Sequence, residues 1–162
     1  MDRRNVFRFA GLSLAGLGLG AGWGRASENL GTFEVQKTDA EWKKLLSPAA
    51  YKVLRHEGTE APNTSPLVNE HRKGTFHCAG CDLALYDSEK KYDSGTGWPS
   101  FFDVLPKAVG TEEDTSLFSV RTAVFCRRCG GHLGHVFDDG PQPTGLRYCM
   151  NGVALNFKPI SA

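Results

Sequence analysis

The chain has 162 residues, which is enough for one domain with a modest core and some additional segments. Charged residues make up 23% of it and the formal net charge is +1, so its composition does not resemble that of a nucleic-acid-binding or acidic-tail protein. Its 19 glycines, 8 prolines and short aromatic clusters such as WPSFF favour short strands joined by loops over a helical bundle.

Residues 1–26 have the features of an export signal. An arginine-rich start precedes a small, apolar run that ends at Trp23, and residues 24–26 (GRA) form a small-x-small pattern that suits cleavage after residue 26. The Arg3-Arg4 pair resembles a bacterial twin-arginine signal, and the apolar run is too short and glycine-rich for a membrane-spanning helix. We therefore predict an exported, periplasmic protein, with an uncleaved anchor or a disordered tail as the alternative.

The segment after the signal predicts a linker and then a short helix. Residues 27–37 have no periodic pattern and are predicted to be an extended linker. Thr38 and Glu41 have the spacing of a helix-capping box. The apolar positions of this helix are predicted to share one face: Trp42, Leu45 and Leu46.

A second short helix is predicted directly after the first. Ser47 is a typical N-cap residue and Pro48 a typical first helical residue. The apolar residues that follow are Tyr51, Val53 and Leu54, and Gly58 is predicted to end the helix. Residues 59–74 are loop by composition.

The rest of the chain predicts short strands separated by turns rich in glycine and aspartate. The strand-like segments are TFHC, LALY, FFDVL, SLFSVRTAVFC, LGHVF, LRYC and VALNF. Short, closely spaced strands of this kind indicate a compact, mainly β antiparallel domain. This one domain, residues 38–160, is predicted to carry the function.

Four of the five cysteines form two Cys-x-x-Cys steps, CAGC and CRRC. They are Cys78, Cys81, Cys126 and Cys129. Two such steps can place four thiolates at the corners of a tetrahedron, the coordination that zinc prefers. A site closed by four cysteines is structural, because it leaves no open position for water or substrate. We therefore predict one structural Zn²⁺ per chain.

Two other interpretations of these cysteines remain open. In an oxidising compartment the four residues could form two disulfides. One pair could instead be a thioredoxin-like redox motif, although no βαβ pattern surrounds either pair. The doubled step, followed by the turn at Gly130-Gly131, favours zinc.

The fifth cysteine, Cys149, stands alone in the segment RYCMN and is a candidate nucleophile. The segment GGHLGHVF supplies His132 and His135, on a predicted strand or loop. Trp98 lies in the turn SGTGWPSFF and is either a core residue or the wall of a pocket. Taken singly, each could be structural, since a lone cysteine is often a small buried hydrophobic residue. Their combination with the cysteine pairs favours a catalytic site.

These motifs together resemble the B-type methionine sulfoxide reductases, which reduce methionine-R-sulfoxide. The resemblance spans about residues 38–160 and rests on four segments in order: CAGCDLALY, SGTGWPSFF, CRRCGGHLGHVFDDGP and RYCMNGVALNF. It implies two small antiparallel sheets with short N-terminal helices. It also implies an enzyme that repairs oxidised methionine residues in proteins and so protects against oxidative stress.

The resemblance implies a role for each site residue. Cys149 would attack the sulfoxide sulfur as a thiolate, and Arg147 would help to lower the pKa of its thiol. His132 and His135 would position the sulfoxide oxygen and deliver the proton that it needs. Asn151 would help to hold the site. A further residue, Trp98, would present its ring to the S-methyl group of the substrate and set the stereochemistry.

The chain departs from many members of that family at Thr96. Those members carry a resolving cysteine at this position of the SGxGWPSF turn. The resemblance therefore implies direct reduction of a Cys149 sulfenic acid by an external thiol or a thioredoxin-like donor, without an internal disulfide.

Two other functions fit parts of the sequence. One is a zinc-bearing binding module with a structural Cys149, although such a module would not require the tryptophan, histidines and asparagine around it. The other is a different thiol-handling enzyme, which would act on glutathione adducts and not on sulfoxides.

Overall fold

The computed structural model describes residues 33–116 and 119–160. The predicted export signal, residues 1–26, lies outside these residues, as does the first half of the predicted linker. None of the helices in the described ranges has the length and apolar character needed to cross a membrane.

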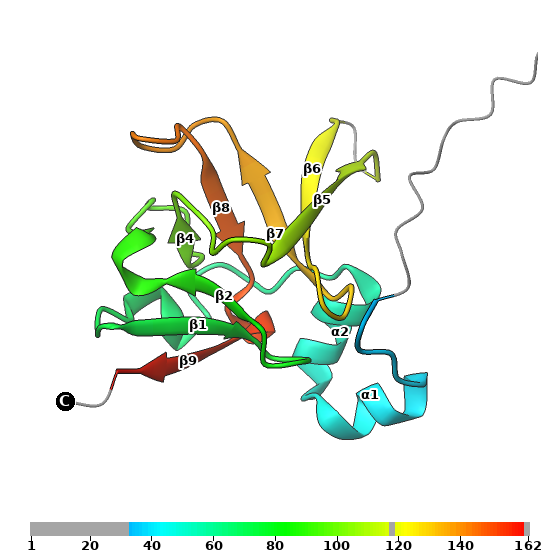
Figure 1. Ribbon diagram of the computed structural model, residues 1–162. Coiled ribbons are helices and arrows are strands. Elements are labelled where there is room, and N and C mark those ends of the chain that lie inside the picture. The colour runs from blue at the N-terminus through cyan, green and yellow to red at the C-terminus, as the bar shows by residue number, and fades with distance from the viewer. Residues whose placement is uncertain (1–32, 117–118, 161–162) are drawn as a thin grey trace, which may run out of the picture. The chain divides into compact units, whose positions relative to one another are not determined.

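Within the described ranges the strands form two antiparallel sheets, as predicted (Figure 1). The smaller sheet has the order β2-β1-β9, made of β1 (Gly74–Cys78), β2 (Ala84–Asp87) and β9 (Leu155–Pro159). The larger sheet has the order β3-β4-β8-β7-β6-β5. Its strands are β3 (Lys91–Tyr92), β4 (Ser100–Phe101), β5 (Val109–Asp114), β6 (Arg121–Cys126), β7 (His132–Phe137) and β8 (Arg147–Met150).

Helix α1 (Asp39–Leu45) begins with the predicted capping box. The Thr38 side chain accepts from the backbone N–H of Glu41, and the Glu41 carboxylate accepts from the backbone N–H of Thr38. Trp42 and Leu46 are buried, as expected. Leu45 is 53% exposed, so its predicted place on the buried face is wrong. It follows Trp42 by three positions, but the helix stops there and no neighbouring element covers it.

Helix α2 (Pro48–His56) has Ser47 as N-cap and Pro48 in its first turn, as predicted. Its end differs from the prediction, because Glu57, with φ 53°, takes the left-handed conformation. Gly58 instead donates its N–H to the carbonyl of Lys52 at 3.1 Å. A Cβ atom on Gly58 would lie 2.9 Å from Cγ of Lys52, so glycine is needed here for close approach.

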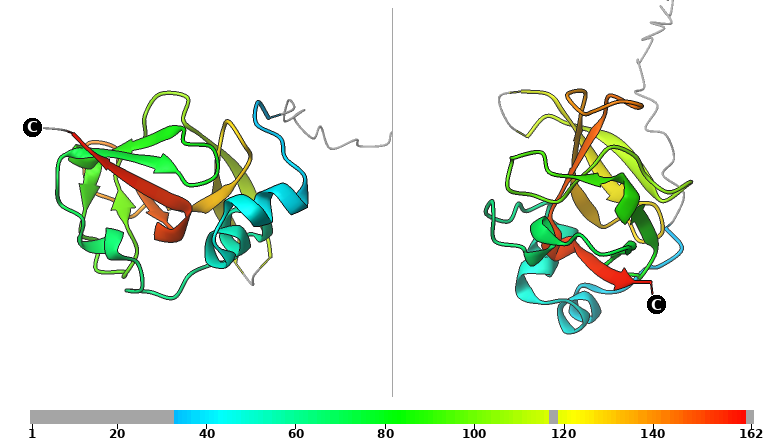
Figure 2. Two further views of the ribbon diagram at one scale, coloured as in Figure 1. Left: turned by 90° about the horizontal axis from the view of Figure 1, so that it is seen from below. Right: turned by 90° about the vertical axis from the view of Figure 1, so that its left-hand side faces the viewer.

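Aromatic packing joins the two sheets, whose ribbons Figure 2 shows from two further sides, into one core. The ring of Phe101 in β4 stacks on Tyr86 of β2 at 4.3 Å between centroids. It also meets the edge of Phe76 in β1 at 4.9 Å. All three side chains are fully buried, and burial of large aromatic side chains is a major source of stability in a small domain.

Three segments differ from the sequence prediction. β5 (Val109–Asp114) was not predicted as a strand, because it is acidic, largely exposed and begins with valine and glycine. It forms a strand by pairing with the more apolar β6. Strand structure in the segment FFDVL covers only Phe101, because Asp103 and Pro106 follow it. Residues 66–69, predicted as loop, form the short 3-10 helix η1 (Pro66–Asn69), capped by Ser65.

The described part of the predicted linker, residues 33–37, contacts the domain. The ring of Phe33 meets the edge of Phe125 at 5.9 Å, and Val35 donates its N–H to the carbonyl of Arg128 at 3.0 Å. These residues therefore pack against β6 and the turn that follows it.

A β-bulge in β7 determines which way its histidines point. Val124 of β6 pairs with Gly134, whereas the next residue, Phe125, pairs with His132, so β7 contains one extra residue there. In a regular strand, residues 132 and 135 would point to opposite faces. The extra residue brings the rings of His132 and His135 to 5.3 Å between centroids.

Gly134 is the residue on which this bulge depends. A Cβ atom there would lie 2.2 Å from the carbonyl oxygen of Cys149 on β8. We expect Gly134→Ala to lower the free energy of unfolding by about 2–3 kcal/mol, because β7 and β8 must separate to admit the methyl group. Urea denaturation of the two proteins measures this difference.

Gly145→Ala provides the matched control. Gly145 also has positive φ (72°), but a Cβ atom there would meet nothing within 4 Å. Only the backbone conformation is then penalised, and we expect a loss of about 1 kcal/mol. Equal losses for the two variants would contradict the assignment of a steric role to Gly134.

Candidate functional site

Cys149 lies in the middle of the larger sheet, on β8 between β4 and β7. It pairs with Ser100 of β4 on one side and with His135 of β7 on the other. Its side chain is partly exposed at a cavity of about 130 Å³. The residues that line this cavity are Thr59, Trp98, Arg121, Gly134, His135, Phe137, Cys149 and Asn151. Four of the predicted site residues therefore meet at one cavity.

His135 is held by an acidic partner that the sequence analysis missed. Its Nε2 lies 2.7 Å from Oδ2 of Asp114 in β5, and a guanidinium nitrogen of Arg121 lies 2.6 Å from the same oxygen. Hydrogen bonds from Ser116, then the bond from His135 and the charge of Arg121, hold the pKa of Asp114 well below its ordinary value. An ionised Asp114 can only accept, so Nε2 of His135 carries a hydrogen and Nδ1 is the nitrogen left for another partner.

His132 lies behind His135 and does not line the cavity. It is 5% exposed, and its Nε2 is buried without a hydrogen-bond partner among the described residues. Burial, followed by the neighbouring His135, lowers the pKa of His132 to about 4. His132 is therefore a neutral imidazole at neutral pH.

Glu60 joins Trp98 to Asn151. Its carbonyl accepts from Nε1 of Trp98 at 3.1 Å, and its N–H donates to Oδ1 of Asn151 at 2.9 Å. Its carboxylate accepts from the backbone N–H groups of Gly152 and Val153. Asn151, 3% exposed, also donates from Nδ2 to the carbonyl of Leu133 at 3.0 Å. Glu60 thus fixes two walls of the cavity, yet no sequence pattern distinguished it within its loop.

Arg147 precedes Cys149 by two residues and shares its face of β8. Its guanidinium makes two bonds of 2.8 Å to the carboxylate of Asp139 and lies 4.3 Å above the ring of Phe137. The Asp139 partner raises the pKa of Arg147, and in turn the pKa of Asp139 is lowered. Arg147 does not line the cavity, so any effect of its charge on the Cys149 thiol acts along the strand.

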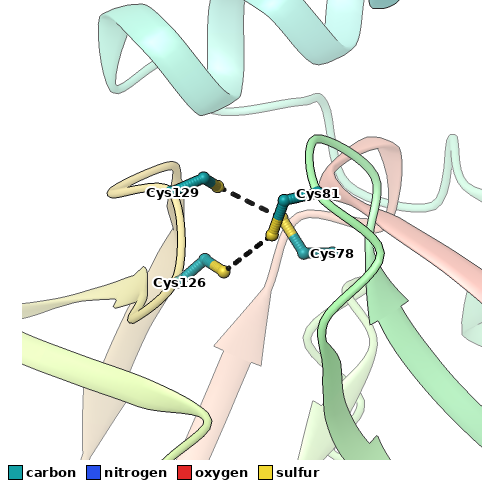
Figure 3. A group of neighbouring side chains, drawn as sticks. All are labelled: Cys78, Cys81, Cys126 and Cys129. Carbon is teal, nitrogen blue, oxygen red and sulfur yellow. Dashed lines mark hydrogen bonds between the residues drawn. The ribbon is translucent and has the colours of Figure 1, made fainter. Parts of the chain in front are cut away.

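The four paired cysteines converge at the ends of the two sheets (Figure 3). Cys78 ends β1 and Cys126 ends β6, while the second residue of each pair lies in the following turn. The sulfurs all lie within 4.8 Å of one another, with 3.7 Å between Cys78 and Cys129 and 3.5 Å between Cys81 and Cys126.

This geometry fits a tetrahedral metal site better than disulfides. Metal–sulfur bonds of about 2.3 Å place the sulfurs of a tetrahedron about 3.8 Å apart, close to the separations found here. A disulfide would need about 2.05 Å, and no disulfide joins any of the five cysteines. The guanidinium of Arg55 in α2 donates to the carbonyl of Cys129 at 3.0 Å and so ties this helix to the site.

Comparison with known proteins agrees with this arrangement. The SelR domain model matches residues 46–159. The chain is 54% identical over 125 residues to the peptide methionine sulfoxide reductase MsrB of Methanosarcina barkeri, which covers 76% of this chain and 88% of that protein. It is 51% identical to the MsrB of Agrobacterium fabrum over 78% of this chain and 95% of that protein.

A third relative is the MsrB of Leptospira interrogans, 50% identical over 78% of this chain and 97% of that protein. The similarity therefore extends over nearly the whole length of each of these relatives and over the part of this chain that forms the two sheets. Both the matched domain and the extent of these identities show that the chain belongs to the MsrB family.

Proposed function

We propose that the chain is an enzyme that reduces methionine-R-sulfoxide residues in proteins to methionine, with Cys149 as the nucleophile. The observation that carries the proposal is the position of Cys149 at a cavity walled by Trp98 and His135. Membership of the MsrB family supports the same activity. In a binding module with a structural cysteine, none of these three residues would need to meet at a cavity.

The proposed reaction transfers the sulfoxide oxygen from the substrate to Cys149. The Cys149 thiolate bonds to the sulfoxide sulfur while the sulfoxide oxygen takes up one proton. The resulting hydroxyl group then passes to the Cys149 sulfur, as the sulfur–sulfur bond and the bond between oxygen and the methionine sulfur break. Methionine is released and Cys149 becomes a sulfenic acid, so the cysteine sulfur loses the two electrons that the methionine sulfur gains.

His135 is suited to supply the proton. Asp114 accepts from its Nε2 and so fixes the ring at the wall of the cavity, which makes His135 the better placed general acid of the two histidines. The buried, neutral His132 is suited to a supporting role, in which its Nε2 would bind a water molecule that reaches the sulfoxide oxygen.

Trp98 offers an apolar surface to the S-methyl group. Its indole N–H is occupied by the carbonyl of Glu60, so the ring is fixed and the rest of the indole can contact an apolar ligand. A fixed ring on one side and His135 on the other would distinguish the R from the S sulfoxide, because exchanging the oxygen and methyl positions would place oxygen against the indole.

The sulfenic acid must then be reduced. The other four cysteines form the cluster at the ends of the sheets, and Thr96 occupies the turn beside Cys149. These placements support reduction by an external thiol or thioredoxin-like donor. One thiol would form a mixed disulfide with Cys149 and release water, and a second would restore the Cys149 thiol.

We further propose that the metal of the four-cysteine cluster is one structural Zn²⁺ held by Cys78, Cys81, Cys126 and Cys129. The all-sulfur donor set and tetrahedral spacing support zinc. When bound, the ion would link β1 to β6 and so contribute to folding.

The sequence of residues 1–26 supports the proposal that the protein is exported to the periplasm. The mass of the mature protein recovered from that compartment would show whether cleavage follows residue 26.

The activity is tested with the R and S sulfoxides of a blocked methionine, supplied separately with dithiothreitol. We expect turnover of the R form alone, and a loss of kcat of about 1,000-fold or more in Cys149→Ser, because a hydroxyl at neutral pH is a poor nucleophile. Lack of turnover by folded wild-type protein would contradict the proposed enzymatic function and favour the alternative of a zinc-bearing binding module. Turnover of a glutathione adduct instead would indicate the other class of thiol enzyme.

The role of Asp114 is tested by Asp114→Asn, with Glu113→Gln on the same strand as control. An amide can donate as well as accept, so it no longer holds the hydrogen of His135 on Nε2, and we expect kcat to fall about 10-fold or more. The exposed Glu113 should have no such effect. An unchanged kcat in Asp114→Asn would contradict the role assigned to Asp114 in orienting His135.

Metal content and thermal unfolding test the zinc site. We expect one zinc per chain in the wild-type protein and in Cys149→Ser, and loss of zinc in Cys126→Ser with a melting temperature at least about 10 °C lower. A metal-free wild-type protein with two disulfides by mass would overturn the assignment.

A further inference from the structure

Three hydroxyl groups form a continuous chain from the backbone to the Cys149 sulfur. Ser100 Oγ lies 3.1 Å from the carbonyl oxygen of Trp98 and 2.7 Å from Ser94 Oγ. Ser94 Oγ lies 2.8 Å from Thr96 Oγ1, which in turn lies 3.9 Å from the Sγ of Cys149. We name these residues, Ser94, Thr96 and Ser100, the hydroxyl chain.

The fold fixes the hydroxyl chain against Cys149. Ser100 is fully buried and pairs directly with Cys149 across β4 and β8. The turn that carries Thr96 has glycines with positive φ on both sides, Gly95 at 70° and Gly97 at 89°. The carbonyl of Gly97 accepts from the N–H of Asn63 at 2.7 Å, which anchors the turn to the preceding loop.

Counting hydrogens gives a definite order when Cys149 is a thiol. The hydroxyl chain has four gaps, each between two atoms that a hydrogen can join. They lie between the Cys149 sulfur and Thr96, between Thr96 and Ser94, between Ser94 and Ser100, and between Ser100 and the carbonyl of Trp98. Each hydroxyl and the thiol supplies one hydrogen, and the carbonyl can only accept. All four gaps are filled only if every donor points away from Cys149, from the thiol toward the carbonyl.

Ionisation of Cys149 removes one of the four hydrogens. Three hydroxyl hydrogens then serve four gaps, so one gap must go without. A charged acceptor forms the stronger hydrogen bond, so the thiolate takes the Thr96 hydrogen. The two gaps between hydroxyl oxygens are short, 2.8 and 2.7 Å, and would be repulsive without a hydrogen. Ser94 therefore donates to Thr96 and Ser100 to Ser94, and the longer bond of 3.1 Å from Ser100 to the carbonyl of Trp98 is given up.

We propose that the hydroxyl chain is a reversible hydrogen-bond relay that stabilises the Cys149 thiolate and reverses its direction when Cys149 gains or loses its proton. Thr96 contacts the reacting sulfur, whereas Ser94 and Ser100 are positioning residues that act through it. The relay also links the charge on Cys149 to the carbonyl of Trp98, the residue proposed above to contact the substrate. Its benefit to turnover rests on the proposed function, but its effect on the thiol does not.

Several charged and titratable groups surround the same sulfur and act on it together with the relay. They are Tyr92 on β3, Asp114 on β5, Arg121 on β6, His135 on β7, and Arg147 on β8 with its partner Asp139. The test must therefore vary the hydroxyls while leaving all of these groups in place.

The test measures the pKa of the Cys149 thiol from the pH dependence of iodoacetamide alkylation. Zinc-loaded protein is used, and modification of the peptide that contains Cys149 is followed by mass spectrometry. We expect Thr96→Val, which keeps the shape but removes the hydroxyl, to raise the thiol pKa by about 1. Ser94→Ala should raise it by less, because Thr96 can still donate.

Two control variants separate hydrogen bonding from packing. Thr96→Ser restores the hydroxyl and should keep the wild-type thiol pKa, as should Thr122→Val, which removes an exposed hydroxyl from β6. The same pKa in Thr96→Val as in the wild type would overturn the relay, as would an equal rise in Thr96→Ser. Sulfoxide turnover is measured separately; if no protein reduces sulfoxide, the proposed function fails while the alkylation result still decides the relay.

Discussion

The register of β8 is the constraint on which the site depends. Because β8 lies between β4 and β7, Cys149 has Ser100 on one side and His135 on the other. A shift of one residue would turn the cysteine to the opposite face of the sheet. The same register brings two groups to a single sulfur: the Thr96 hydroxyl, in the turn before β4, and His135 of β7, the proposed proton donor. In the proposed reaction, the two requirements of sulfoxide chemistry, a stabilised thiolate and an acid, would thus be met from the two neighbours of β8.

Three local devices hold this register in a small domain. The bulge in β7 turns both histidines to one side, and Gly134 allows the backbone of β8 to approach closely. Glu60 holds Trp98 and Asn151 through its backbone and its carboxylate. The four-cysteine cluster joins the ends of β1 and β6, which belong to different sheets. The site is therefore assembled from segments far apart in sequence, each fixed by its own contacts.

Local chemistry explains which features could be predicted from the sequence. The capping box at Thr38 and the Ser47-Pro48 helix start are short-range signals, and both are present in the structure. Spacing alone also revealed the clustered cysteines. In contrast, Glu60 and Asp114 act through contacts with residues more than 20 positions away, Asn151 and His135, and neither lies in a recognisable motif. The bulge in β7 could not be predicted from the sequence either, because it is a property of the pairing of β7 with β6.

We propose that Cys149 itself takes the oxygen from the substrate. This is tested by a single-turnover experiment without reductant, with an R-sulfoxide substrate and dimedone to trap sulfenic acid. We expect one equivalent of methionine per chain and a dimedone adduct on Cys149, with the four clustered cysteines unmodified. Methionine formation without oxidation of Cys149, or with the adduct on a clustered cysteine, would contradict it.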